Sequence, residues 1–310
     1  MGVWHSAGMD LPHSRAVPVR IGVVGVGRMG EPISRTLTGS HLVQVFDADP
    51  VRTTTAPDLA WADSLQELAA ASDVLVTVLP GPVELRQVMV EVLPLLPPGA
   101  LWLDLTSGDP AVTRDLAAHA AQHDVLVVSA PMGGSVDEAA QSTLVFFVSG
   151  EEVALARALP ILEALAKDGG IRRAGARAED GQIVKLLANG LWFAHAVAAA
   201  EALLIGQALG ISPTELHHLL RDSAGGSRFL DEHAGRLLDG DYLTTFGVDR
   251  VVEELDTIST MARTAQVATP VLDASSSLHH AALDHFGPEL GELLAVKLLE
   301  HRTGRQLRTD

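Results

Sequence analysis

The sequence contains no cysteine, so it can form neither a disulfide bond nor a cysteine metal site, and it has no thiol nucleophile. Basic residues are scarce: 22 Lys and Arg against 39 Asp and Glu give a net charge of −17 at pH 7. This charge argues against a nucleic-acid partner, whose phosphate backbone is also negative. The motifs G-x-S-x-G and G-x-x-x-x-G-K-[ST] are absent as well, so hydrolase and P-loop functions lack support.

Residues 1–19 lack the apolar segment of a secretion signal. We therefore expect residues 1–18 to form a flexible tail and the protein to be cytoplasmic. Only the stretch 181–210 is apolar over about the 20 residues that a membrane span needs. It carries Lys185, Asn189 and Glu201, which argues against a membrane partner.

The 13 histidines include two adjacent pairs, at 217–218 and 279–280. Adjacent residues of a helix point in different directions, so these pairs do not form a metal site. We expect no bound metal.

Strand-like and helical stretches alternate through the first half of the chain. The strand-like runs are 19–24, 42–46, 73–79, 100–105, 125–128 and 144–149, and the helical ones are 33–37, 83–93, 110–121 and 151–166. This alternation is typical of a doubly wound, mostly parallel α/β sheet, or Rossmann domain. Ligands of such sheets bind at the carboxyl ends of the strands, where loops 79–82, 104–110 and 130–137 fall.

The first predicted strand ends in a G-x-G-x-x-G motif, formed by Gly25, Val26, Gly27, Arg28, Met29 and Gly30. Between a strand and a helix, this motif indicates a dinucleotide-binding turn. The first glycine permits the tight turn, the second lets a pyrophosphate approach, and the third allows close packing of the helix. The alternative is a glycine-rich turn without a ligand.

Asp47 ends the second predicted strand, 22 residues after Gly25. A carboxylate at about this offset accepts hydrogen bonds from the ribose hydroxyls and repels a 2′-phosphate. No arginine follows at once, so we predict NAD rather than NADP as the cofactor. The alternative is that Asp47 only caps the next turn.

The stretch 181–210 predicts one long helix that joins two domains. Gln182, Lys185 and Asn189 share one face of it, and Lys185 is its only lysine. A buried ammonium is costly, so Lys185 faces a cleft or a partner, or it reaches the surface beside Gly190. Partial desolvation would lower its pKa towards the range of a general base.

The second half of the chain carries no strand pattern. Further helices are predicted at 211–221, 227–238, 248–266, 271–283 and 288–300. We therefore predict a dinucleotide-binding domain over residues 19–178 and an all-helical domain over residues 179–310.

Four segments in this order resemble the β-hydroxyacid dehydrogenases, the family of 3-hydroxyisobutyrate dehydrogenase, tartronate semialdehyde reductase and, more distantly, 6-phosphogluconate dehydrogenase. The segments are VVGVGRMGEPIS at 23–34, DVLVTVLP at 73–80, DLTSGDP at 104–110 and GQIVKLLANG at 181–190. The resemblance covers residues 19–300. It implies an NAD(P)-dependent oxidoreductase that transfers a hydride between nicotinamide and a small hydroxy acid or semialdehyde.

The resemblance also assigns residues. It places Lys185 as the general acid/base and Asn189 as the group that orients the lysine or the substrate oxygen. Beyond the glycine turn and Asp47, it implies cofactor contacts at Leu79, Pro80 and Thr106, and substrate contacts at Ser107, Gly133, Gly134 and Ser135. The helical domain is expected to bind substrate and to form a homodimer.

The chain departs from the family at two places. Gly133-Gly134-Ser135 stands where the family has S-G-G, and Asp137 and Glu138 follow it. Glu253-Glu254-Leu255 stands where the family has K-D-L. The added carboxylates would repel a hydroxy acid, so a neutral or cationic substrate, or a small hydroxy acid held by other groups, is expected.

Two other functions stay open. The DLTSG segment is also similar to imine reductases of the same wider superfamily, although these usually favour NADP and commonly have Asp or Tyr in place of Lys185. The altered loop and Glu253 also leave room for a non-catalytic protein that senses NAD or a metabolite.

Overall fold

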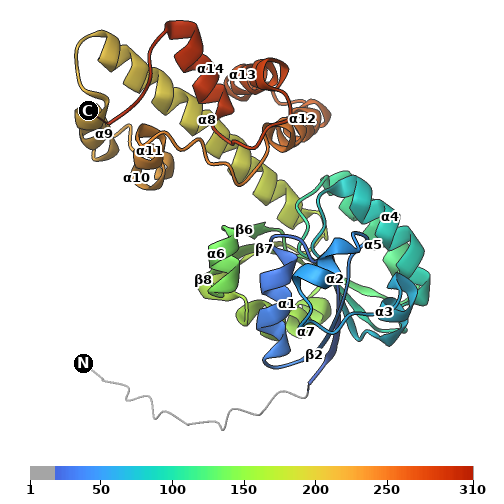
Figure 1. The fold of residues 1–310 in the computed structure, drawn as a ribbon. Helices are drawn as coiled ribbons and strands as arrows, with labels where there is room; N and C mark the ends of the chain where they lie inside the picture. Colours follow the sequence, from blue (N-terminus) through green and yellow to red (C-terminus); the bar gives the residue numbers. More distant parts are fainter. Residues whose placement is uncertain (1–17, 310) are drawn as a thin grey trace, which may run out of the picture.

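The structure is a computed structural model that describes residues 18–309. Residues 1–17, which make up nearly all of the predicted tail, and residue 310 lie outside the described residues. An N-terminal α/β domain is joined to a C-terminal helical domain by one long helix (Figure 1). The predicted fold class, a Rossmann-type, mostly parallel sheet followed by a helical domain, is confirmed.

Eight strands form a single sheet within the described residues. They are β1 (Arg20–Val24), β2 (Leu42–Phe46), β3 (Val74–Thr77), β4 (Leu101–Asp104), β5 (Leu126–Ser129), β6 (Met132–Gly133), β7 (Leu144–Gly150) and β8 (Ala166–Gly175). The order is β2-β1-β3-β4-β5-β7-β6, and β8 pairs with β7. Strands β1 to β5 pair in parallel, whereas β7 runs antiparallel to β5 and β6. The order reverses between β1 and β3, which is where doubly wound sheets bind ligands.

Helices cover both faces of this sheet. The first domain contains α1 (Gly30–Thr38), α2 (Val51–Thr55), α3 (Leu65–Ala71), α4 (Pro82–Val92), the short 3₁₀ helix η1 (Leu93–Leu95), α5 (Pro110–Ala121), α6 (Val136–Ala140) and α7 (Glu152–Glu163). One apolar core packs α1, α6 and α7 against the sheet, and a second packs α3, α4, η1 and α5 against the other face. Strands buried on both faces explain the continuous apolar runs of the sequence.

Strand β8 differs from the prediction. The sequence indicates a helix to residue 166 and nothing regular beyond, but α7 ends at Glu163 and β8 follows. The β8 segment AKDGGIRRAG has little β-propensity, because glycine and charged residues dominate it. It forms a strand because it pairs with the buried strand β7 at the edge of the sheet.

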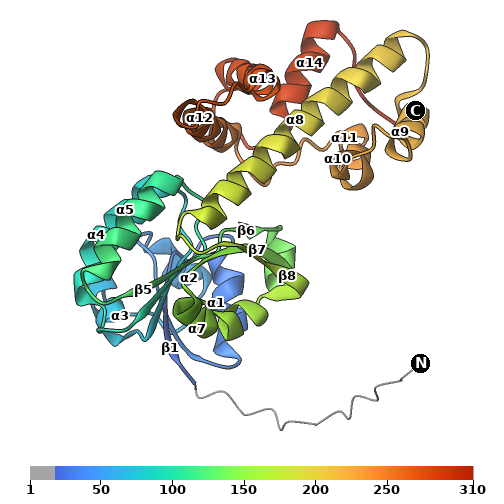
Figure 2. The same ribbon diagram turned by 180° about the vertical axis from the view of Figure 1, so that it is seen from behind.

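The second domain is helical throughout its described part (Figure 2). Its helices are α8 (Asp180–Ala208), α9 (Pro213–Arg221), α10 (Arg228–Glu232), α11 (Ala234–Leu238), α12 (Val248–Thr264), α13 (Pro270–Phe286) and α14 (Leu294–Thr303). The single helix predicted over 227–238 is two helices that break at His233. The helix predicted from residue 288 begins at Leu294, because residues 289–291 instead bond to the backbone of residues 246–248.

Helix α8 extends from the sheet into the helical domain (Figure 1). Among residues 18–309 it is the one helix long and apolar enough to cross a membrane. It contacts β7, β8 and α5 in one domain and most helices of the other, which is the packing of a central helix. Gly190 lets α12 approach closely: a methyl group there would lie 2.9 Å from Ile258 Cδ1.

Candidate functional site

The glycine turn lies where the order of the sheet reverses. Gly25 adopts φ +96°, and a side chain there would collide with the carbonyl oxygen of Val78, just after β3. A side chain at Gly30 would collide with the carbonyl oxygen of Gly25. Both positions therefore require glycine.

Gly27 differs from these two glycines, because a methyl group there would meet no atom within 4 Å. Helix α1 begins just beyond it, and its N-cap residue, Met29, makes no side-chain capping bond. Open space before an uncapped helix N-terminus is the environment that a pyrophosphate needs. The residues present thus fit a dinucleotide at this turn.

Asp47 holds two backbone amides. Its Oδ2 accepts a hydrogen bond from the Val26 N–H at 2.7 Å, and its Oδ1 accepts one from Asp49 N–H at 2.9 Å. The residue therefore does cap the following turn, and it also fixes the glycine turn. Each carboxylate oxygen can accept a further bond, so these contacts leave capacity for ribose hydroxyls.

The loop after β3 contains Leu79 and Pro80, beside the glycine turn. Thr106, at the end of the next strand, is buried, and its hydroxyl accepts a hydrogen bond from Leu79 N–H at 3.1 Å. Thr106 thus positions the loop that is predicted to contact the cofactor. Ser107 is half-buried in the same region.

A buried polar network ties this region to α8. The Gln182 amide donates to the Thr106 carbonyl at 2.7 Å and to Ser129 Oγ at 3.2 Å, and it accepts from Gly108 N–H at 2.9 Å. Its other neighbour is Asp104 Oδ2, at 3.4 Å. The sequence placed Gln182 on the Lys185 face but gave no indication of this network.

Asp104 is fully buried at the centre of the network. Its Oδ1 accepts from Thr77 Oγ1 at 2.8 Å and from Thr106 N–H at 3.0 Å. Desolvation outweighs these bonds and raises the pKa of Asp104 to about 6. Because Gln182 is one turn before Lys185, the network fixes the position of the lysine relative to the sheet.

Lys185 and Asn189 meet as predicted from their spacing. Lys185 Nζ donates to Asn189 Oδ1 at 3.1 Å, and Asn189 Nδ2 donates to Glu254 Oε2, on α12, at 2.7 Å. The Lys185 side chain is partly buried, and desolvation of its ammonium lowers its pKa, against the opposing effect of the negative charges of Glu254 and Glu292. Desolvation likewise raises the pKa of Glu254.

Glu292, just before α14, is a second acid whose charge acts on Lys185. Its Oε2 accepts from Trp192 Nε1 at 3.2 Å and its Oε1 from Thr245 Oγ1 at 3.4 Å. The carbonyl of Thr245 in turn accepts a bond from Arg28 of the glycine turn at 2.9 Å. Sequence reasoning missed Glu292, because no motif or periodicity distinguishes it.

The Gly133–Ser135 loop leads into α6. Ser135 caps this helix: its hydroxyl accepts from Glu138 N–H at 3.3 Å, and its own N–H donates to Glu138 Oε2 at 2.7 Å. The Ser135 hydroxyl can still donate a hydrogen bond to a ligand. The charge of Glu138 also has a minor effect on His233, which lies between α10 and α11.

Glu253 is the acid that replaces a lysine of the family. Its side chain is 58% exposed, and it forms a salt bridge to Arg250 Nη1 at 2.8 Å. Its charge is therefore partly compensated at the surface. The acids that act on Lys185 are Glu254 and Glu292 instead.

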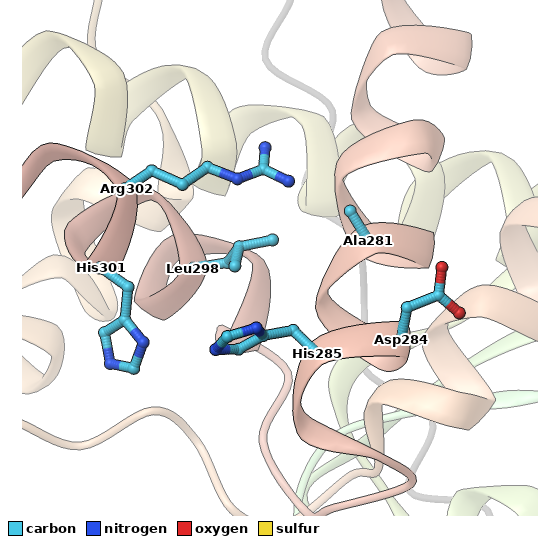
Figure 3. A pocket seen from close by; sticks show the side chains of 6 residues that line it. All are labelled: Ala281, Asp284, His285, Leu298, His301 and Arg302. Atoms are coloured by element: carbon cyan, nitrogen blue, oxygen red, sulfur yellow. The ribbon is translucent and has the colours of Figure 1, made fainter.

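A separate cavity of about 560 Å³ lies between α13 and α14 (Figure 3). Its lining residues are Ala281, Asp284, His285, Leu298, His301 and Arg302. None of the predicted site residues lines it. Within residues 18–309, no group of three or more His, Asp or Glu side chains could hold a metal ion.

Two protein-family models together match most of the described residues. The family model for the NAD binding domain of 6-phosphogluconate dehydrogenase matches residues 20–176. The model described as NAD-binding of NADP-dependent 3-hydroxyisobutyrate dehydrogenase matches residues 180–299.

Individual relatives agree with the family models. A probable 3-hydroxyisobutyrate dehydrogenase of Mycobacterium tuberculosis is 35% identical over 208 residues, which cover 66% of this chain and 70% of that one. An NAD-dependent L-serine dehydrogenase of Pseudomonas aeruginosa is 26% identical over 92% of this chain and 99% of its own. The solved structure of Mycobacterium tuberculosis 3-hydroxyisobutyrate dehydrogenase with L-serine superposes with a TM-score of 0.83. It is 27% identical and covers 91% of this chain and 99% of that one.

The fold, the glycine turn and the Lys185–Asn189 pair thus occur together with full-length similarity to named dehydrogenases. The chain belongs to the β-hydroxyacid dehydrogenase family and is an NAD(P)-dependent oxidoreductase that acts on a hydroxyl group.

Proposed function

We propose that the protein transfers a hydride between NAD and a small hydroxy acid or its semialdehyde, with Lys185 as the general acid/base. The observation that carries the proposal is the position of Lys185. It lies on the helix that Gln182 fixes to the carboxyl edge of the sheet, and it bonds to Asn189, which bonds to Glu254.

Lys185 transfers the proton, and Asn189 orients the lysine. In the oxidative direction, neutral Lys185 Nζ takes the hydroxyl proton while the carbinol C–H bond breaks and the carbonyl forms. The bound nicotinamide supplies the hydride acceptor. The lowered pKa of Lys185 increases the fraction of neutral amine at working pH, and such a base typically contributes about 10²- to 10⁴-fold. Asn189 keeps the amine oriented through its bond to Glu254.

NAD rather than NADP is the proposed cofactor. Asp47 is the support: its carboxylate is fixed by two backbone amides, beside the glycine turn. A 2′-phosphate at the ribose would meet this negative charge. Arg52 is the first basic residue after Asp47 in the sequence. Its Nε lies 3.7 Å from Asp49 Oδ2, so the carboxylate of Asp49 offsets the charge of the guanidinium.

The first test is fluorescence titration of NADH and NADPH with wild type and Asp47→Ala. We expect NADH to bind more tightly to wild type, and this preference to be lost in the variant. A screen of small hydroxy acids would follow, with Lys185→Met as the catalytic control. Tighter NADPH binding would reject the assigned role of Asp47 and make imine reduction the leading alternative. NADH binding without turnover of any substrate would favour a sensor.

We further propose a homodimer through the helical domain. One side of α8 exposes large apolar side chains, with Leu191 at 55% and Ile205 at 62% exposure. Leu187 and Leu209 continue this stripe along the helix. An apolar stripe of this kind marks a contact surface, and a second copy of the helix would complement it.

A further inference from the structure

Glu292 is an acid for which the proposed mechanism has no use. Its two hydrogen bonds come from neutral donors, the Trp192 indole and the Thr245 hydroxyl. Among residues 18–309, no cationic side chain forms a salt bridge with it. By contrast, the more exposed Glu253 has Arg250 as its partner, and Glu254 bonds to the Asn189 amide beside Lys185.

Glu292 nevertheless lies against the face of α8 that carries Lys185. Lys185, Asn189 and Trp192 follow one another at i, i+4 and i+7 on this helix, so their side chains share one face. The indole of Trp192 therefore brings the Glu292 carboxylate to the side where Lys185 lies. The electrostatic effect of Glu292 on Lys185 agrees with this placement.

Among the described residues, the site has two carboxylates and, once Lys185 is neutral, no cation to compensate them. To accept a hydroxyl proton, Lys185 must first be neutral, and its charge then no longer compensates those of Glu254 and Glu292. Burial raises the pKa of Glu292, because desolvation outweighs the bond from Trp192 and the charge of Lys185. Charge-assisted hydrogen bonds to an ammonium group are the strongest that a carboxylate forms.

We infer that Glu292 is a specificity-determining residue that binds a protonated amine of the substrate. The preferred substrate class is then a β-hydroxy-α-amino acid rather than a plain β-hydroxy acid. This inference rests on the proposed function, because the same carbinol is oxidised at Lys185. The C–H bond breaks as its hydride passes to NAD, the hydroxyl proton passes to Lys185, and the amine stays protonated throughout.

L-Serine and 3-hydroxypropionate test the inference, because they differ only in the amine. We expect wild type to favour L-serine in kcat/KM by about 10- to 100-fold, the range of a hydrogen bond to a charged group. Glu292→Gln should lower the L-serine to 3-hydroxypropionate ratio by a similar factor, mainly through KM for L-serine. Glutamine can still accept from Trp192 and Thr245, so the variant should fold and bind NADH as wild type does.

Glu289→Gln is the matched control. It removes the same charge from the same segment, at an exposed position three residues earlier, and should leave the ratio unchanged. The inference is overturned if wild type prefers 3-hydroxypropionate, if Glu292→Gln leaves the ratio as it was, or if Glu289→Gln changes it as much.

The results that would contradict the proposed function differ from those that would contradict the role of Glu292. Failure of the proposed function shows as turnover that survives Lys185→Met, or as wild-type enzyme that neither turns over nor binds either probe in the presence of oxidised NAD. Either result overturns both proposals. Turnover that depends on Lys185 but not on Glu292 overturns only the specificity assignment.

Discussion

Asp104→Asn should change how the stability of the protein depends on pH. Asp104 is fully buried, and its pKa is raised from 3.8 to about 6. A raised carboxyl pKa means that the folded state resists ionisation, so the wild type loses stability as pH rises from about 4 to 6. Above about pH 7 this loss stays constant, because the group is then ionised in both the folded and the unfolded state.

The magnitude follows from the two pKa values. A difference of 6 − 3.8, or about 2.2 units, corresponds to about 3 kcal/mol at pH 7. At pH 5 the loss is about 1.6 kcal/mol by the same linkage relation. The stability of Asp104→Asn relative to wild type should therefore increase by about 1.3 kcal/mol between pH 5 and pH 7. The asparagine Oδ1 can keep the bonds from Thr77 and Thr106, which both reach Asp104 Oδ1.

Urea unfolding of both proteins at intervals from pH 5 to pH 7 measures this difference directly. Asp63→Asn, an exposed acid of the same domain, is the control and should show a much smaller change with pH. A difference between Asp104→Asn and wild type that stays constant within about 0.3 kcal/mol would refute the reasoning, because a group with an unshifted pKa gives that result.

Four other variants test the remaining parts of the structure. Gly27→Ala should fold normally and bind NADH more weakly in a fluorescence titration, since its methyl group fills the open space before α1. Gly25→Ala should instead lower the melting temperature, because residue 25 has a positive φ and its side chain would collide with the Val78 carbonyl oxygen. Gln182→Leu leaves buried polar groups without partners, so urea unfolding should show a loss of about 2–4 kcal/mol, and kcat should fall as Lys185 loses its fixed position. Leu191→Asp should convert the proposed dimer to a monomer in sedimentation velocity, and an unchanged sedimentation coefficient would place the interface elsewhere.

Local signals predicted most of the first domain. Helix α5 has the predicted bounds because Asp109 caps it and Pro110 occupies its first turn, both readable from the sequence. Strand β8 could not be predicted in this way, since pairing with β7, rather than its own residues, makes it a strand. The same holds for the start of α14, which depends on backbone bonds to residues 246–248.

The residues of the candidate site also fall into those that the sequence predicted and those that only the structure revealed. The glycine turn, Asp47, Lys185 and Asn189 follow from spacing and from resemblance to the family. The partners Glu254 and Glu292 come from α12 and from the segment before α14, at sequence separations of 65 from Asn189 and 100 from Trp192. Periodicity within one helix says nothing about a side chain on another, so three-dimensional packing was needed to find them.

The closeness of α8 and α12 at Gly190 gives this non-polar residue influence over the chemistry. A methyl group there would press on Cδ1 at the end of the Ile258 side chain, so either this side chain rotates or α12, which also carries Glu254, shifts. A shift of α12 would lengthen the bond between Asn189 and Glu254 and move the charge of Glu254 away from the Lys185 amine. The pKa of Lys185 thus depends partly on the distance between α8 and α12. Homologues with alanine or serine here should show a shifted pH–rate profile although every ionisable residue is retained.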